Sequence, residues 1–107
     1  MTTPEHAVVT TTTDTEPKAH HLATEVINAR LAACAQIYPV SSVYHWEGKV
    51  EQAREWRIDF KTRTSLVSGL SDRIAELHDY DTPEVVAVPV VGGGAAYLGW
   101  VTEETAG

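Results

Sequence analysis

The segment 34-CAQIYPVSSVYHWEGKVEQAREWRIDFKTR-63 decides the fold, because it reads as two long strands joined by a tight turn. Residues 47–48, Glu-Gly, form the predicted two-residue turn. In that register Ile37 lies opposite Ile58, and alternation along both strands then builds one apolar face that predicts a core. A bulge at Pro39 would reverse the alternation over part of the strand, and this alternative stays open.

The opposite face of the predicted hairpin is rich in aromatic and charged residues. It carries Tyr38, Tyr44 and Trp46, and it places Cys34, the only cysteine of the chain, opposite Lys61. A sheet with helices on one side only would leave this face bare. Contiguous exposed apolar surface usually marks an interaction site. We therefore expect this face to contact something.

The length of the hairpin gives a second reason to expect a partner. Its second strand, residues 49–63, would span roughly 50 Å if straight, at about 3.3 Å per residue. A domain of this size is only about 35 Å across. We expect the hairpin, with Tyr44, Trp46 and Trp56, to be covered by another copy of the chain in a homo-oligomer. The alternative is that Tyr44 and Trp46 fold back on their own domain.

The rest of the chain supplies the other elements of a small α+β domain. Residues 1–6 read as a flexible N-terminal tail, and residues 7–107 as a single domain. The predicted order is β-α-β-β-α-β followed by a short helix, the pattern of a ferredoxin-like sandwich. Its further elements are a strand at 7–13, a helix capped by Asp14 or Thr15, a helix from about Ser65, a strand at 84–91 that Pro89 confines to an edge, and a closing helix with Tyr97, Trp100 and Val101 on one face.

Composition and charge exclude several classes of function. The formal net charge is −7, with eight basic and fifteen acidic residues, which argues against nucleic-acid binding. No apolar run approaches the length of a membrane span, and the N-terminus lacks the features of a signal peptide. A single cysteine cannot form a disulfide within the chain, so the cytoplasm is the expected location.

Candidate chemistry is sparse. Lys61 beside Cys34 would favour a thiolate that acts as a nucleophile or soft-metal ligand, although most free cysteines are packing residues. Glu84, fixed after a Thr-Pro pair, is a candidate to meet Lys61 in a cleft, or it forms an ordinary surface ion pair. The five histidines show no zinc or copper spacing, and the Gly-Gly-Gly at 92–94 lacks a phosphate-loop motif. We expect a protein that is not an enzyme and requires no cofactor.

Taken together, the motifs resemble one family closely. In order they are "RLAAC", "S-x-Y-x-W-x-G" with Val43 and His45 at its variable positions, "KT" at 61–62, "Y-x-x-P-E" at 80–84 and "Y-L-x-W" at 97–100. This set is similar to the CutA divalent-cation tolerance proteins over residues 7–102. The resemblance implies a ferredoxin-like subunit in a tight, PII-like homotrimer, in the cytoplasm, linked to tolerance of copper and other divalent cations.

The resemblance also implies a site and a weakened metal centre. By analogy with the PII signalling proteins, an intersubunit pocket would contain Cys34, Lys61, Tyr80, Glu84 and Trp100. Family members proposed to bind copper have a cysteine at the end of the first strand and a His-His pair. Here the aligned positions are Thr11, Leu77 and His78, so only His78 remains as an expected Cu(II) ligand.

Three functions therefore stay open. The first is a trimeric protein of the metal-ion response that binds copper or another divalent cation. The second is a PII-like signalling protein that binds a small ligand between subunits. The third is a trimeric scaffold that recruits protein partners.

Overall fold

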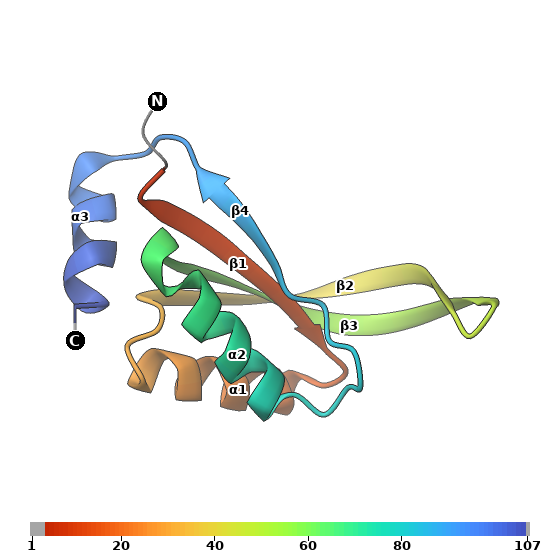
Figure 1. Cartoon of the computed structure of the whole chain (residues 1–107). Helices are drawn as coiled ribbons and strands as arrows, with labels where there is room; N and C mark the ends of the chain where they lie inside the picture. Colours follow the sequence, from red (N-terminus) through yellow and green to blue (C-terminus); the bar gives the residue numbers. More distant parts are fainter. Residues whose placement is uncertain (1–3, 107) are drawn as a thin grey trace.

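The computed structural model describes residues 4–106, which form one four-stranded antiparallel sheet and three α-helices (Figure 1). This confirms the predicted α+β, ferredoxin-like order of elements. The elements are β1 (His6–Thr13), α1 (Glu16–Asn28), β2 (Cys34–Trp46), β3 (Lys49–Arg63), a 3-10 turn (Thr64–Leu66), α2 (Val67–Leu77), β4 (Val86–Val90) and α3 (Ala95–Glu104).

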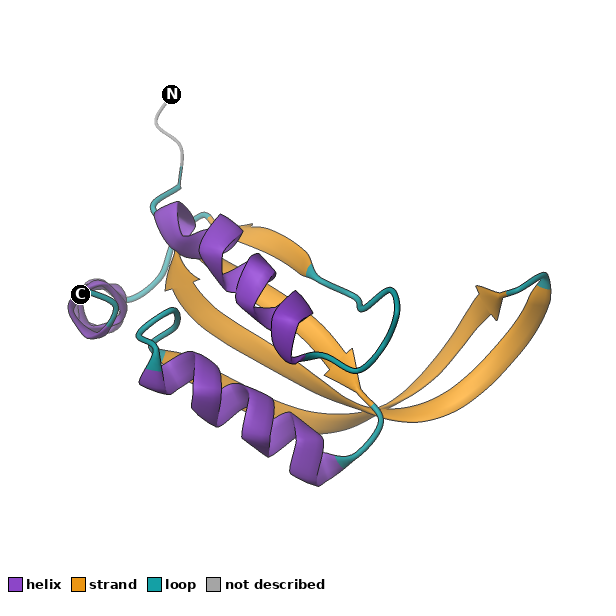
Figure 2. Ribbon diagram, turned by 60° about the horizontal axis from the view of Figure 1, so that its bottom comes forward, coloured by secondary structure: helices purple, strands orange, loops and turns teal. Residues whose placement is uncertain are grey.

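The sheet has the strand order β2-β3-β1-β4, so β4 lies at an edge. That position suits Pro89, which has no N–H to give to a second neighbour. Figure 2 shows α1 and α2 side by side on one face of the sheet. The opposite face therefore has no helical cover over most of its length.

The core lies between this pair of helices and the central strands. Apolar spacing along α1 buries Ala19, Leu22, Ala23 and Val26, as an amphipathic helix should. The Thr15 side chain accepts a hydrogen bond from the backbone N–H of Lys18 and so caps the helix, one of the two caps expected. The completely buried residues of the sheet and α2 that meet this helix are Val9, Ile58, Phe60, Leu70 and Ile74.

The hairpin register agrees with the prediction along its whole length. Cys34 lies opposite Lys61, Ile37 opposite Ile58, and the same step continues without a bulge at Pro39. Glu47 and Gly48 both have positive φ, 51° and 79°, as a two-residue turn that follows the strand twist requires. Beyond the helices the hairpin curves away from the body (Figures 1 and 2), and the molecule measures 43 × 31 × 21 Å.

Some boundaries differ from the sequence-based expectation. The ordered chain begins before residue 7, since Thr64 hydrogen-bonds the carbonyl groups of Pro4 and Glu5; residues 1–3 of the predicted tail lie outside the described residues. The second helix begins with a 3-10 turn. In α3 only Val101 is buried, whereas Tyr97 and Trp100 are 46% and 39% exposed.

No helix among residues 4–106 combines the length and the apolar character needed to cross a membrane.

Candidate functional site

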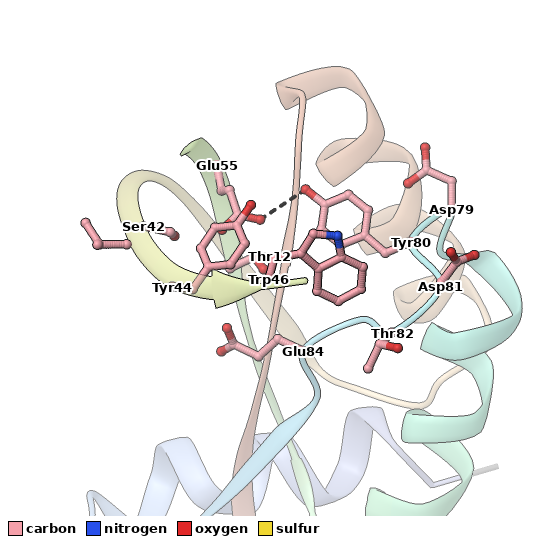
Figure 3. Close-up of a pocket in the computed structure, with 11 residues that line it drawn as sticks. Thr12, Ser42, Tyr44, Trp46, Glu55, Asp79, Tyr80, Asp81, Thr82 and Glu84 are labelled. Carbon is pink, nitrogen blue, oxygen red and sulfur yellow. Dashed lines mark hydrogen bonds between the residues drawn. The ribbon is translucent and has the colours of Figure 1, made fainter. Parts of the chain in front are cut away.

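An open cavity of about 670 Å³ lies at the base of the projecting hairpin (Figure 3). Alternation along β2 directs every second side chain toward it, including Tyr44 and Trp46. The neighbouring strand β3 contributes Glu55, and the loop between α2 and β4 contributes Tyr80 and Glu84. The site therefore depends on the overlong hairpin and on a loop that is separated from it in the sequence by the whole of α2.

Hydrogen bonds fix one wall of this cavity. The Tyr80 hydroxyl donates to a carboxylate oxygen of Glu55 at 3.0 Å, and the Tyr80 backbone N–H donates to Nδ1 of His78 at 3.1 Å. Nδ1 is thus an acceptor, so the proton is on Nε2, which donates to the carbonyl of Thr12 at 2.6 Å. Burial and the bond to Glu55 raise the pKa of the Tyr80 hydroxyl, which therefore stays a donor at neutral pH.

His78, the expected metal ligand, is engaged within its own chain. Its side chain is 1% exposed, and both ring nitrogens already have hydrogen-bond partners. A metal ion would have to displace one of them. Thr11, which stands where copper-binding relatives are expected to have cysteine, is completely buried, and its hydroxyl has no partner among the described residues. Within residues 4–106 no three His, Cys, Asp or Glu side chains form a group that could hold a metal ion.

The cavity is acidic. Asp79 at its rim pairs with Lys18 at 2.5 Å, and this hydrogen bond lowers the pKa of the Asp79 carboxyl. Glu55, Asp81 and Glu84 also line the cavity, and none of the three has a salt bridge among the described residues. No lysine, arginine or histidine contributes to the described lining. The cavity thus holds more negative charge than its own chain compensates.

A second cavity, of about 470 Å³, lies between α1, the start of β2 and α3. Cys34, Trp100 and His20 line it. Tyr97 is close by: burial raises the pKa of its hydroxyl, and the Cys34 thiol adds to the effect. Lys61, opposite Cys34 in the sheet, donates a hydrogen bond to Gln36.

The five residues expected to form one pocket therefore fall into two groups within a single chain. Tyr80 and Glu84 line the cavity at the hairpin base, whereas Cys34 and Trp100 line the second cavity. Lys61 belongs to the second group through its pairing with Cys34. Their meeting in a pocket between subunits stays a prediction.

The three hairpin aromatics also differ in their surroundings. Trp56 packs against the core of its own subunit. Tyr44 and Trp46 line the first cavity and remain 42% and 46% exposed, so they lie over their own chain and still present surface. Sequence reasoning did not single out Glu55. Alternation along β3 places Glu55 on the same face of the hairpin as Tyr44 and Trp46. Nothing local in the sequence indicates that Tyr80 reaches it.

A separate polar cluster occupies the helix-free face of the body. Asp59 accepts hydrogen bonds from the hydroxyls of Tyr38 and Thr10, both at 2.8 Å, and from Nε of Arg57 at 3.2 Å. Burial raises the pKa of Asp59, but these donors outweigh it and hold the pKa below its usual range. The cluster explains how a carboxylate is accommodated in a central strand.

Comparison with known proteins agrees with this architecture. The family model described as CutA1 divalent ion tolerance protein matches residues 7–104. The "Divalent-cation tolerance protein CutA" of Salmonella newport is 41% identical, over 92% of this chain and 86% of its own. "Protein CutA 1, chloroplastic" of rice is also 41% identical over 97% of this chain, which spans 59% of the rice protein's length.

Solved structures agree as well. The periplasmic divalent cation tolerance protein CutA of Archaeoglobus fulgidus superposes with a TM-score of 0.92 at 32% identity, over 94% of this chain and 99% of that one. CutA of Synechococcus elongatus superposes with a TM-score of 0.93 at 29% identity. The superposition covers 99% of this chain and 95% of that one. Motifs, fold and the family match over residues 7–104 all lead to one conclusion: the chain belongs to the CutA1 divalent ion tolerance family.

Proposed function

We propose that this protein contributes to divalent-cation tolerance as a homotrimer, in the cytoplasm. Family membership supports the link to divalent cations. The observation that carries the assembly is the hairpin, which projects from the body with exposed apolar side chains: Val43 is 67% exposed, Val50 64%, Tyr44 42% and Trp46 46%. The edge strand β4 adds exposed Val86 and Val88. Surface of this kind is normally covered in a stable protein.

The trimer would also complete the pocket that sequence reasoning expected. Cys34, Lys61 and Trp100 of one subunit would face Tyr80 and Glu84 of the next. Within one chain Tyr80 and Glu84 line one cavity and Cys34 and Trp100 another, so the proposed pocket requires a second copy.

A bound Cu(II) ion would need ligands from more than one subunit. Cys34 and His20, which line the same cavity, offer the sulfur and nitrogen donors that copper favours. His78 could join only by giving up a hydrogen bond to Thr12 or Tyr80. Since no group of three metal ligands exists within the described residues, the metal would bind at or near a subunit boundary.

Native mass spectrometry of the protein with and without Cu(II) tests both the homotrimer and the binding of copper. We expect a trimer that takes up a whole number of copper ions, with uptake reduced in Cys34→Ala. His78→Ala is the matched variant, and it should retain copper because both ring nitrogens of His78 are already engaged by Thr12 and Tyr80 in the native protein. A monomer would refute the assembly, and a copper-free trimer would refute metal binding while leaving the assembly intact.

A second candidate function is small-ligand binding in the manner of a signalling protein. The cavity of about 670 Å³ favours it, since ligand sites typically have volumes of about 300–1,000 Å³. A thermal-shift screen of small ligands against the trimer would test it. Ligands that stabilise the native protein but not the Lys61→Ala variant would place the ligand in the proposed intersubunit pocket.

A further inference from the structure

We propose that His78 is a positioning residue, whose imidazole ties the loop between α2 and β4 to the sheet and thereby orients Tyr80 and Glu84. All the contacts involved lie within one chain. Only the use of the two oriented side chains, in a pocket between subunits, rests on the proposed function. The side chain of His78 is only 1% exposed in a single chain, so a second copy has almost no surface of it left to cover.

The end of β1 lacks a strand neighbour on the side of β4. The two strands pair only as far as Thr10, which lies opposite Val86, whereas β1 continues to Thr13. Beyond that point the imidazole of His78 takes the neighbour's place, since its Nε2 donates to the carbonyl of Thr12 at 2.6 Å. Thr12 is buried, and a buried carbonyl without a donor destabilises a fold. The bond therefore anchors the C-terminal end of α2 to the sheet.

The chain that follows His78 has little else to fix its path. Outside the strand ladders, no backbone group of residues 79–85 bonds another backbone group in the part of the chain that the structure describes. The ion pair of Asp79 with Lys18 is half exposed and contributes little. The Tyr80 N–H instead donates to Nδ1 of His78 at 3.1 Å, across the same two-residue step by which Asx turns fix a backbone. One imidazole thus joins the loop to β1 through its two nitrogens.

This anchor determines where the side chains of the loop lie. The rings of His78 and Tyr80 pack with their centroids 4.6 Å apart, and the Tyr80 hydroxyl reaches the carboxylate of Glu55 on β3 (Figure 3). Glu84 lies on the same loop, where Pro83 restricts the backbone directly before it. His78 is not among the described residues that line the cavity, so it acts through the loop. A wall ordered in advance loses less conformational entropy when a ligand or another subunit meets it.

Hydrogen exchange at single amides of the assembled protein, followed by NMR, tests the proposal. In His78→Ala the Tyr80 amide should exchange about 10-fold faster than in the native protein, because the net contribution of one hydrogen bond corresponds to about that factor. Core amides such as that of Phe60 should keep their exchange rates. His21→Ala, at an exposed histidine of α1, is the control and should leave the Tyr80 amide unchanged. An unchanged Tyr80 amide in His78→Ala, or equal acceleration at Phe60, would overturn the proposal.

The orientation of the side chains has its own readout. Nuclear Overhauser contacts between the Tyr80 ring and the Glu55 side chain should weaken in His78→Ala, and contacts of native strength would contradict the positioning role. The shorter side chain of His78→Asn can accept from the Tyr80 N–H but does not reach Thr12, so it should protect the loop only in part. Native protection in His78→Asn would show that the local turn alone orders the loop, against the proposal.

Tyr80→Phe tests the opposite end of the chain of contacts. This variant keeps its backbone N–H and loses the bond to Glu55, so the amide at position 80 should exchange at close to the native rate. Loss of protection there would assign the ordering of the loop to Glu55 and would overturn the role of His78. A monomeric native protein would refute the proposed trimer and leave these tests unaffected, because every bond that they probe lies within one chain.

Discussion

The two halves of the β2–β3 ladder share one hydrogen-bonding register and differ in what covers them. Under the helices, Ile58 and Phe60 are completely buried. Farther along the same strands, Val43 and Val50 are 67% and 64% exposed. Backbone pairing alone therefore keeps the hairpin extended, whereas burial of side chains stabilises the body. We therefore expect the projecting half to gain stability from contacts outside this core.

Truncation of one residue in each half gives the largest expected contrast. Phe60→Ala should lower the free energy of unfolding by about 3–5 kcal/mol, because it leaves a cavity in a close-packed core. Within a single chain Val50→Ala should change it by less than about 0.5 kcal/mol, as exposed substitutions usually do, so any larger loss in the assembled protein reports the proposed contact between subunits. Urea unfolding followed by circular dichroism measures both. A large loss in Val50→Ala that depends on protein concentration would place Val50 in the subunit interface.

Removing the hydrogen bond that joins the loop after α2 to the hairpin should lower the free energy of unfolding by an intermediate amount. Tyr80→Phe removes the hydrogen bond to the buried carboxylate of Glu55, and we expect a loss of about 1–3 kcal/mol in the free energy of unfolding. Tyr97→Phe is the control, since Tyr97 is 46% exposed. Thermal unfolding of the two variants checks this. Equal stability of Tyr80→Phe and the native protein would mean that water replaces the bond.

The smallest expected effect concerns the loss of stability at acidic pH, here called the acid limb. We expect Asp59, in the body of the domain, to contribute to it. Its pKa is lower in the folded state than in the unfolded chain, so its ionised form stabilises the fold above pH about 4. This contribution disappears as the pH falls through the folded-state pKa. Asp59→Asn should therefore flatten the loss of stability below pH about 4.

Chemical denaturation at a series of pH values between about 2 and 7 would measure this. Tyr38→Phe removes one of the donors to Asp59 and should flatten the acid limb only in part. An unchanged acid limb in Asp59→Asn would show that other carboxylates determine it.

Much of the fold could be predicted because the decisive signals are local. Alternation over residues 34–63 and a turn that accepts positive φ at Gly48 together determine the hairpin register. Helical spacing of apolar residues identifies α1 and α2, and Pro89 identifies an edge strand. A closing helix with Tyr97, Trp100 and Val101 was also expected, but the sequence could not show that Tyr97 and Trp100 remain exposed in a single chain.

The candidate site was only partly predictable, because it depends on contacts between distant segments. Tyr80 and Glu84 were expected in a pocket between subunits; both line a cavity of one chain, and the intersubunit pocket stays a prediction. Glu55 was missed, because its burial results from the reach of Tyr80 around the end of β1. His78 stood out as a metal ligand because it aligns with the histidine pair of family members proposed to bind copper. Its hydrogen bonds to Thr12 and Tyr80 could not be read from the sequence.

The elements, their order, the hairpin register and the family could be read from the sequence, because periodicity, turn chemistry and motif spacing act over short distances along the chain. The tertiary structure was needed to show which carboxylates lack a salt bridge and which aromatic rings share a cavity with them. Those properties depend on how the hairpin curves and where the loop between α2 and β4 crosses it. Such geometry arises from the packing of many residues at once, and no single stretch of sequence encodes it.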